Sequence, residues 1–138
     1  MLHLGNSVLV LASCMGIATA QSVHLFGDTN FGLSTGHWLF EFSMAQFCVN
    51  AVAFIDKASS AQWRDLPQAG GFANNQSFIA FYTDRNCTGT VRTWPTAEKD
   101  FPTNFALNGI DNQISSFMVW KTSDKVGGIA ADPTYLLL

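Results

Sequence analysis

The chain repeats itself at a fixed offset. Aromatic, acidic, amide and serine positions recur later in the chain, in the same order and with the same spacing. The matching positions are Phe26 and Tyr82, Asp28 and Asp84, Asn30 and Asn86, Trp38 and Trp94, Asp56 and Asn112, and the serine pairs 59–60 and 115–116. Two copies are too few for a solenoid, which needs at least three. We therefore expect one domain, residues 21–122, made of two similar halves at about 22–64 and 78–122.

Short apolar runs separated by turn residues fill both halves. Runs with these features, closely spaced, are typical of an all-β sandwich. The expected strands lie at residues 23–26, 38–40, 77–82, 91–94 and 115–121. Residues 44–54 have apolar residues at mixed spacing and predict at most a single helical turn. The Gly pair at 70–71 and the Asn pair at 74–75 indicate the linker between the halves.

Residues 1–20 have the pattern of a secretory signal peptide. They contain no Asp, Glu, Lys or Arg, and an apolar run at 8–12 precedes Ala18-Thr19-Ala20, an A-x-A cleavage site. The run is too short for a membrane anchor, which needs ~20 apolar residues, and no second long apolar run follows. We expect cleavage after Ala20, secretion to the extracellular space and no membrane span.

The cysteines fit an oxidising compartment. Cys14 lies in the signal peptide, which leaves Cys48 and Cys87 in the mature chain. An even pair in a secreted chain predicts a disulfide, which would stabilise the fold by about 4 kcal/mol in the chain-entropy model. Two buried free thiols are the alternative. The absence of a C-x-x-C motif argues against structural zinc.

Charge and motif content exclude several function classes. Seven Lys and Arg against ten Asp and Glu give a net charge of −3, which disfavours a nucleic-acid or polybasic membrane binder. No G-x-S-x-G, H-E-x-x-H or P-loop occurs, and His24 and His37 have no motif around them. Paired carboxylates could cleave glycosides, but nothing fixes their separation. We therefore expect no enzyme.

The four tryptophans have two interpretations. Trp38, Trp63, Trp94 and Trp120 could form a sugar-binding platform. Trp38 and Trp94 occupy equivalent positions in the repeat, which favours a role as core residues of the two halves. We expect the second arrangement.

The repeated turns resemble those of the βγ-crystallin family. Each half begins with an aromatic residue, a turn, a second inward residue and a glycine, at 26–32 and 82–89. Each half later carries an acidic or amide pair followed by two serines, which in the second copy is Asp111-Asn112-Gln113-Ile114-Ser115-Ser116. The resemblance covers residues 22–122. It implies a β-sandwich of two Greek-key motifs.

The resemblance also implies calcium binding. In the family this run is a calcium signature, and each site is shared between the turn of one half and a serine of the other. Calcium takes six to eight oxygen ligands, among them carboxylate, carbonyl, hydroxyl and water oxygens. In the second copy Gln113 would offer its carbonyl and Ser115 its hydroxyl, while Asp111 and Asn112 would hold the loop or ligate directly.

The first copy offers a second set of ligands. Lys57 would give its carbonyl and Ser59 its hydroxyl beside Asp56, and the turn carbonyls would come from Gly27 and Thr83. The family's pattern is incomplete here. The first copy has Ile55 where Asp or Asn is usual, the turns carry Gly27 and Thr83 where the family often has Glu, and Lys57 brings a positive charge.

These departures predict one usable calcium site, in the second copy, and one impaired site. Fewer carboxylates weaken calcium binding, so we expect a dissociation constant of order 10⁻⁴ M or weaker. The alternative is that the motif serves only as turn chemistry, because Asp, Asn and Ser side chains also bond their own backbone. Cys87 is the repeat equivalent of Phe31, and we expect it to face the same core.

Three functions remain open. The first is a secreted, non-catalytic, calcium-stabilised domain. The second is a secreted antagonist, since small proteins resembling βγ-crystallins include killer toxins and a metalloproteinase inhibitor; the loop at 64–75 would be its contact. The third is a carbohydrate-binding module. The protein or glycan partner is not indicated, and we expect a monomer.

Two sequons and the C-terminal segment complete the expectations. Asn75-Gln76-Ser77 and Asn86-Cys87-Thr88 are N-glycosylation acceptors, of which Asn75 is the better candidate because Asn86 adjoins a disulfide cysteine. Residues 123–138 contain Gly127-Gly128 and Pro133 and predict a loose tail. Its apolar end, residues 135–138, could dock on the domain instead.

Overall fold

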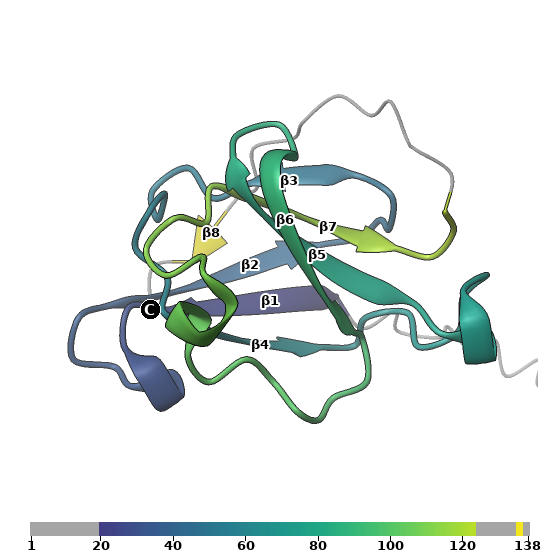
Figure 1. Ribbon diagram of the computed structural model, residues 1–138, viewed down its shortest axis with the longest axis horizontal. Coiled ribbons are helices and arrows are strands. Elements are labelled where there is room, and N and C mark those ends of the chain that lie inside the picture. The colour runs from purple at the N-terminus through teal and green to yellow at the C-terminus, as the bar shows by residue number, and fades with distance from the viewer. Residues whose placement is uncertain (1–19, 124–134, 137–138) are drawn as a thin grey trace, which may run out of the picture.

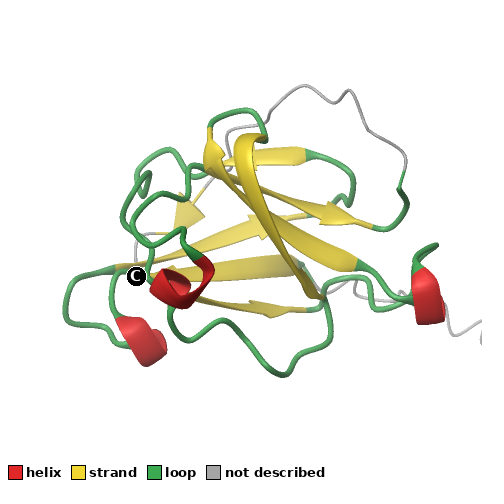
Figure 2. Ribbon diagram, viewed as in Figure 1, coloured by secondary structure: helices red, strands yellow, loops and turns green. Residues whose placement is uncertain are grey.

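The computed structural model describes residues 20–123 and 135–136. The expected signal peptide, apart from its last residue, and most of the expected tail lie outside these residues. No helix among the described residues is long and apolar enough to cross a membrane. The regular elements (Figures 1 and 2) are β1 (Gln21–Phe26), η1 (Thr29–Phe31), β2 (His37–Phe42), β3 (Cys48–Asn50), β4 (Ser60–Arg64), η2 (Ala73–Asn75), β5 (Phe78–Asp84), β6 (Thr88–Pro95), η3 (Phe105–Asn108), β7 (Ser116–Trp120) and β8 (Tyr135–Leu136), where η marks a 3₁₀ turn.

The strands form two antiparallel sheets. The first has the order β4-β1-β2-β8 and the second the order β3-β7-β5-β6. In Figure 1 the strands of the second sheet run across those of the first. A sheet with one apolar face must bury that face, and here each sheet covers the other. The expected all-β sandwich is confirmed.

Each half contributes a segment that bonds to the sheet of the other half. β3, from the first half, pairs with β7 of the second. The segment before η3 does the reverse, because the Ala61 amide donates to the Pro102 carbonyl at 3.1 Å and the Phe105 amide donates to the Ser59 carbonyl at 2.8 Å. In a Greek key, three consecutive strands pair as hairpins and the fourth returns to lie beside the first. The two halves are therefore interlocked.

Alternation along the strands decides which side chains fill the sandwich. In β5, Ile79 and Phe81 belong to the main core, while Ala80 and Tyr82 belong to a smaller cluster on the outer face of the second sheet. The main core takes residues from both sheets and is rich in phenylalanine.

Most of the tryptophans are core residues. Trp38 stacks on Phe54 with ring centroids 4.1 Å apart, and Trp94 packs edge-on against two core phenylalanines at 5.7 Å. Trp63 is fully buried, with 1% of its surface exposed. The expected core role of Trp38 and Trp94 is confirmed. Trp120 is half-buried at the outer cluster, so the four rings form no common platform.

Cys48 and Cys87 form the expected disulfide, with Cα atoms 5.8 Å apart. The alternative of two free thiols is excluded. The expectation that Cys87 faces the main core is wrong, because it packs on the outer cluster beside Tyr82 and Met118. Phe31, its equivalent in the first half, also lies outside the main core. The bond ties β3 to the turn between β5 and β6.

No regular helix lies within residues 44–54, for which the pattern predicts at most a single turn. β3 occupies the middle of this segment, and a tight turn follows it, in which the Phe54 amide donates to the Ala51 carbonyl at 2.7 Å. The apolar residues have mixed spacing because the strand is very short and the chain then turns. Local pattern could not reveal a strand whose partner lies in the other half.

The expectation of a loose tail is wrong for the two described residues. Tyr135–Leu136 form β8, which pairs antiparallel with β2 at the edge of the first sheet. These two residues dock on the domain, which is the alternative stated for the apolar end of the chain. The pairing gives the exposed edge of β2 hydrogen-bond partners.

Candidate calcium sites

The second serine of each serine pair supports a turn. Ser60 Oγ donates to the Asp28 carbonyl at 2.6 Å and accepts from the Phe31 amide at 3.1 Å. Ser116 makes the same two bonds, at 2.6 and 2.9 Å, to the turn of residues 84–87. Each turn holds two consecutive residues with positive φ, of which the first is Asn, a residue that tolerates this conformation. Ser60 and Ser116 are therefore structural, which leaves the first serine of each pair for binding.

The first serine of each pair points at the loop of the other half. Ser115 Oγ donates to Asp56 Oδ1 at 3.2 Å, and Ser59 Oγ lies 3.5 Å from Asn112 Oδ1. Both serines are buried, whereas Asp56 and Asn112 are exposed. Each buried hydroxyl thus lies against a solvent-facing loop of the other half.

Backbone hydrogen bonds hold each loop against the opposite half. The Asp56 amide donates to the Ile114 carbonyl and the Asn112 amide to the Ala58 carbonyl, both at 3.0 Å. Asp56 and Asn112 have left-handed backbones, with φ of 58° and 53°. Asp and Asn adopt this conformation more readily than other non-glycine residues, which explains the residue types here.

The start of each turn lies beside the first serine of a pair. The Ser59 amide donates to the Phe26 carbonyl at 2.8 Å, which sets Gly27 beside Ser59. The Ser115 amide makes the equivalent bond at 2.9 Å, to the residue before Thr83. Each serine therefore lies beside the turn of its own half, whereas the resemblance implies the turn of one half together with the serine of the other.

The candidate ligands fall into two groups. The first group, which we call the Asp56 site, contains Asp56, Lys57, Ser115 and Thr83. The second group, the Asn112 site, contains Asn112, Gln113, Ser59 and Gly27. Sequence reasoning kept each serine with the loop of its own copy. The structure instead brings Ser115 to the first-copy loop and Ser59 to the second-copy loop, because the halves exchange strands.

The oxygen spacing fits a calcium ion. Calcium–oxygen distances of 2.3–2.6 Å place neighbouring ligands about 3 Å apart. The Ser115–Asp56 pair, at 3.2 Å, and the Ser59–Asn112 pair, at 3.5 Å, are both longer than an ordinary O–H···O hydrogen bond of about 2.7–2.8 Å. The pairs are thus loose as hydrogen bonds but correctly spaced as two ligands of one ion.

Asp111 adds an unsatisfied oxygen next to the Asn112 site. Its Oδ2 accepts from the Asn112 side chain at 3.2 Å, while its Oδ1 is buried without a partner in the described part of the chain. A buried carboxylate oxygen ordinarily has a hydrogen-bond donor, a water or a cation beside it. Asp111 therefore both holds the loop and offers an acceptor.

The charge around the sites is low. Lys57 places its ammonium 5.9 Å from the centre of the Trp38 ring, a cation–π contact that engages the charge. Across residues 20–123, no group of three or more His, Cys, Asp or Glu side chains could hold a metal. Any calcium ligand set built from the described residues relies mainly on carbonyl, hydroxyl and amide oxygens.

Asp28 belongs to the turn rather than to a site. Its carboxylate accepts from the Ser34 hydroxyl at 2.7 Å and from the Thr35 amide and hydroxyl at 3.0 and 2.9 Å. These hydrogen bonds, that of Ser34 first, lower the pKa of Asp28 below its usual range. The carboxylate is therefore ionised and occupied in closing the β1–β2 hairpin.

Sequence reasoning missed a pairing of the two histidines. Nε2 of His24 lies 2.7 Å from Nδ1 of His37. Burial, and then the neighbouring charge of His37, lowers the pKa of His24 to about 4. No motif surrounds either residue, so only the hairpin register of β1 and β2 brings them together.

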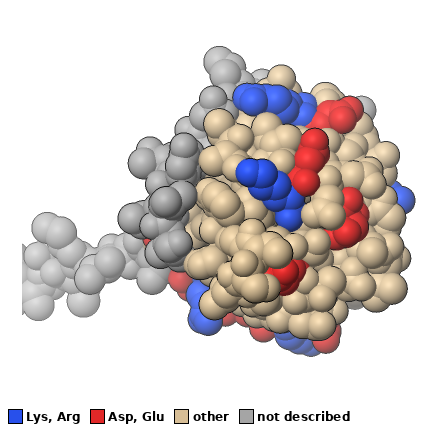
Figure 3. All heavy atoms as spheres, turned by 90° about the vertical axis from the view of Figure 1, so that its left-hand side faces the viewer, with Lys and Arg blue, Asp and Glu red and all other residues tan. Residues whose placement is uncertain are grey.

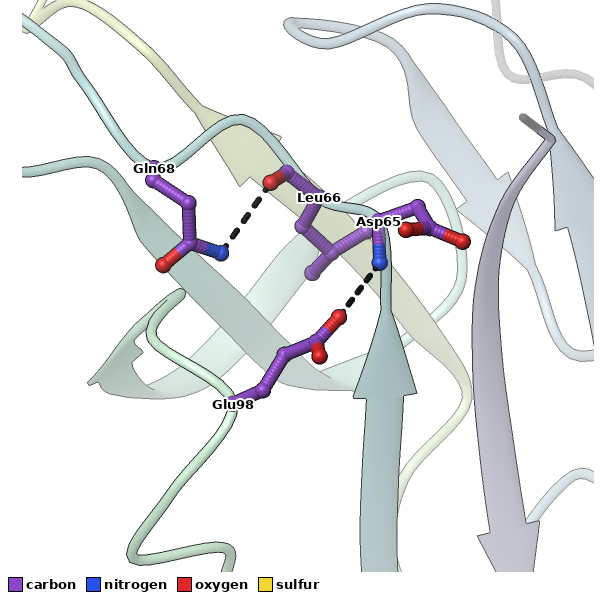
Figure 4. Close-up of a pocket in the computed structure, with 4 residues that line it drawn as sticks. All are labelled: Asp65, Leu66, Gln68 and Glu98. Carbon is purple, nitrogen blue, oxygen red and sulfur yellow. Dashed lines mark hydrogen bonds between the residues drawn. The ribbon is translucent and has the colours of Figure 1, made fainter. Parts of the chain in front are cut away.

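An open hollow of about 430 Å³ lies beside the loop that follows β4 (Figure 4). Its lining residues are Asp65, Leu66, Gln68 and Glu98. Glu98 accepts from the Asp65 amide at 2.7 Å, and Gln68 donates to the Leu66 carbonyl at 3.2 Å. The polar groups brace the loop, and the hollow holds no candidate calcium ligand.

The sequons differ in their surroundings. Asn75 lies exposed in η2. Asn86 Oδ1 accepts from the Asn50 side chain at 3.2 Å, and the Asn86 amide donates to Asn50 Oδ1 at 2.9 Å. Asn86 also adjoins the disulfide at Cys87. The accessible position is Asn75.

Charged residues are scattered over the face drawn in Figure 3, with Lys and Arg beside Asp and Glu among mostly uncharged residues. The whole sequence carries only 12% charged residues.

Comparison with solved structures returns βγ-crystallin domains. A domain from Clostridium beijerinckii is 18% identical, with 73% of this chain and 99% of that chain covered and a TM-score of 0.46. One from an archaeon is 24% identical, with 72% and 96% covered and a TM-score of 0.45. One from Flavobacterium johnsoniae is 15% identical, with 74% and 97% covered and a TM-score of 0.44. No protein-family model matches the sequence, and no curated protein is similar to it.

Proposed function

We propose that this chain is a secreted, non-catalytic, βγ-crystallin-like domain that calcium stabilises by bridging its two halves. The observation that carries the proposal is the oxygen pair of Asp56 and Ser115, 3.2 Å apart although the residues come from different halves. The equivalent pair of Asn112 and Ser59 repeats it with the roles of the halves exchanged.

We expect the Asp56 site to be the stronger of the two, which reverses the expectation from the sequence that the site of the second-copy loop is the usable one. Calcium affinity rises with the negative charge of the ligands, and Asp56 supplies a carboxylate where Asn112 supplies a neutral amide. Ser115 belongs to the second copy, which carries the complete signature. That copy therefore supplies the hydroxyl group of the Asp56 site. Asp111 lends its charge to the Asn112 site from the adjacent position.

Calcium would act as a cross-brace. A ligand that binds only the folded state stabilises it by mass action, by about 1.4 kcal/mol when calcium is tenfold above its dissociation constant. Extracellular modules bind calcium with dissociation constants of about 10⁻⁴–10⁻³ M. A secreted protein meets calcium outside the cell. Ser59 and Ser115 each lie at the point where one half touches the loop of the other, which is where a brace has most effect.

The disulfide supports secretion. Cys48–Cys87 is a bond that forms and persists in oxidising compartments, and the A-x-A site at residues 18–20 is the expected route there. Both features point to the same compartment, in which calcium is also plentiful.

The test is calorimetric calcium titration of the oxidised protein, with thermal melts in calcium and in chelator. We expect binding and a rise of the melting temperature of about 5 °C, from the stabilisation above. Ser115→Ala should lose the tighter phase and Ser59→Ala only the weaker one. Ser43→Ala, an exposed serine outside both sites, is the matched control. No heat and no shift up to millimolar calcium would refute the proposal.

A secreted antagonist remains the second candidate, supported by a braced loop. The Gly71 amide donates to the Lys121 carbonyl at 2.7 Å, and the Gly70 amide donates to the Asn75 carbonyl at 3.0 Å. The loop at 64–75 is thus exposed in part yet held to the body, and a preordered loop loses little entropy on binding. Assays of protease inhibition and of growth inhibition with purified protein test this candidate.

A further inference from the structure

His24 and His37 face one another on the outer side of the first sheet. In β1, the flanking residues Val23 and Leu25 point into the main core, so His24 points outward. His37 pairs in register with Phe26, which lies on the same face as His24 and next along it. The two rings therefore sit at diagonal positions of neighbouring strands, within reach of each other.

The two rings bring one nitrogen each to the same place. Nε2 of His24 and Nδ1 of His37 are 2.7 Å apart, a distance at which the two nitrogens share one proton. The Phe26 ring stacks on His24 with centroids 4.0 Å apart and limits its rotation. When His24 carries its proton on Nδ1 and His37 carries its proton on Nε2, both neutral rings turn a nitrogen lone pair toward the space between them.

We propose that His24 and His37 together bind a divalent transition-metal ion, copper(II) foremost, through Nε2 of the first and Nδ1 of the second. Neutral imidazole is a common ligand of copper, nickel and zinc. Calcium takes oxygen ligands and does not compete for these nitrogens. The inference is independent of the proposed calcium sites, because none of their residues takes part.

The geometry favours metals with ligands at right angles. With metal–nitrogen bonds of about 2.0–2.1 Å, nitrogens at a right angle are about 2.9 Å apart, and those of a tetrahedral site about 3.3 Å apart. From 2.7 Å the nitrogens need to separate by about 0.2 Å for the first arrangement and about 0.6 Å for the second. Because the ring centroids are 4.9 Å apart, the two nitrogens face one another almost head-on, so both rings must also turn to aim their lone pairs at one ion. Tetragonal sites suit copper(II) and nickel(II), so both should bind more tightly than zinc.

The surroundings permit such an ion. Gln62 lies opposite His24 on β4, while Glu41 and Arg64 both flank Ser22 and carry opposite charges. In the register of the sheet, therefore, neither histidine has a Lys or Arg directly opposite it on β1, β2 or β4. Water would complete the coordination, since no third His, Cys, Asp or Glu of the described residues joins the pair.

The experiment titrates the oxidised full chain, free of a histidine tag, with copper(II), nickel(II) and zinc(II) separately. The third histidine, His3, is replaced by Gln in every arm so that an ion bound there is not counted. His24→Gln and His37→Gln are compared with Glu41→Gln, a control on the same face of β2. Circular dichroism and disulfide content establish that each variant is folded.

We expect one copper per chain, an electron paramagnetic resonance spectrum with coupling to two nitrogens, and binding in the order copper, nickel, zinc. Each histidine variant should weaken copper binding at least tenfold, and Glu41→Gln should match its parent. The proposal is overturned if no copper binds, if either histidine can be removed without loss, or if zinc binds more tightly than nickel.

Discussion

Ser115 and Asp56 are 59 residues apart in the chain, yet the serine hydroxyl donates to the aspartate carboxylate at 3.2 Å. Each belongs to a different half and has a backbone bond to the other half: the Asp56 amide donates to the Ile114 carbonyl, and the Ser115 carbonyl accepts from the Ala51 amide. The contact exists because the halves exchange strands, so a ligand bound between these two oxygens joins parts of the chain that separate on unfolding. This relationship leads to the predictions below.

Asn112→Asp should strengthen the weaker calcium site. The change adds a carboxylate at the oxygen that faces Ser59, and ligand charge raises calcium affinity, here by about tenfold. Calorimetric titration measures it. Asn74→Asp is the matched control, because Asn74 also has a positive φ, of 61°, but lies in the linker. Equal affinities of the two variants would contradict the assignment.

Ser60→Ala and Ser116→Ala should destabilise the fold by similar amounts without removing a calcium ligand. Each hydroxyl is fully buried and joins a carbonyl to an amide of a turn, so its loss leaves both groups unsatisfied, at about 1–3 kcal/mol each. Urea unfolding in chelator measures the free energy. A large effect in one half alone would show that the turns are not equivalent.

Replacing both cysteines by serine should lower the free energy of unfolding by about 2–4 kcal/mol. The disulfide closes a sequence separation of 39 and anchors β3 to the turn between β5 and β6. Denaturant unfolding of the Cys48→Ser/Cys87→Ser variant, against the oxidised parent, measures the difference. A free energy unchanged within error would show that β3 is held by its pairing with β7 alone.

Acid should destabilise the protein partly through His24. Its pKa is lowered to about 4 in the folded state by burial and by His37, so the unfolded chain binds the proton first as pH falls. Stability from this group is complete above about pH 6.5, declines between about 6.5 and 4, and changes no further below. The partly exposed ring reduces the loss to about 1 kcal/mol.

Unfolding free energies at pH 7 and pH 4, measured in chelator, test the role of His24. The parent should lose about 1 kcal/mol more than His24→Gln over this interval, because the variant lacks the titrating ring. Comparing the pH dependence of the two proteins, rather than their absolute stabilities, removes the effect of the lost hydrogen bond to His37. Identical pH dependence would contradict the prediction.

The repeat explains why much of the fold could be predicted. Its constant offset pairs Ser60 with Ser116 and Asp56 with Asn112, and the structure gives each pair equivalent hydrogen bonds. Local pattern also identified most of the longer strands and the disulfide. It failed for β3, because so short a strand is defined by its partner in the other half rather than by its own periodicity.

The arrangement of the candidate sites needed the topology. Sequence reasoning assigned Ser115 to the loop of its own copy, whereas the structure brings it to Asp56 of the other copy, because pairing between the halves leaves no local signal. The pairing of His24 with His37 depends on the register of the hairpin, and a shift by a single position would send one ring to the opposite face.

A double-mutant cycle on calcium affinity tests the central claim most directly, using Asp56→Asn, Ser115→Ala and the combined variant. If both side chains bind one ion between the two halves, each single change should weaken calcium binding about tenfold or more. The combined variant should then be little worse than the weaker single one, because residues of one site are not additive. Losses that add fully, or an affinity that neither change alters, would contradict a site shared by Asp56 and Ser115.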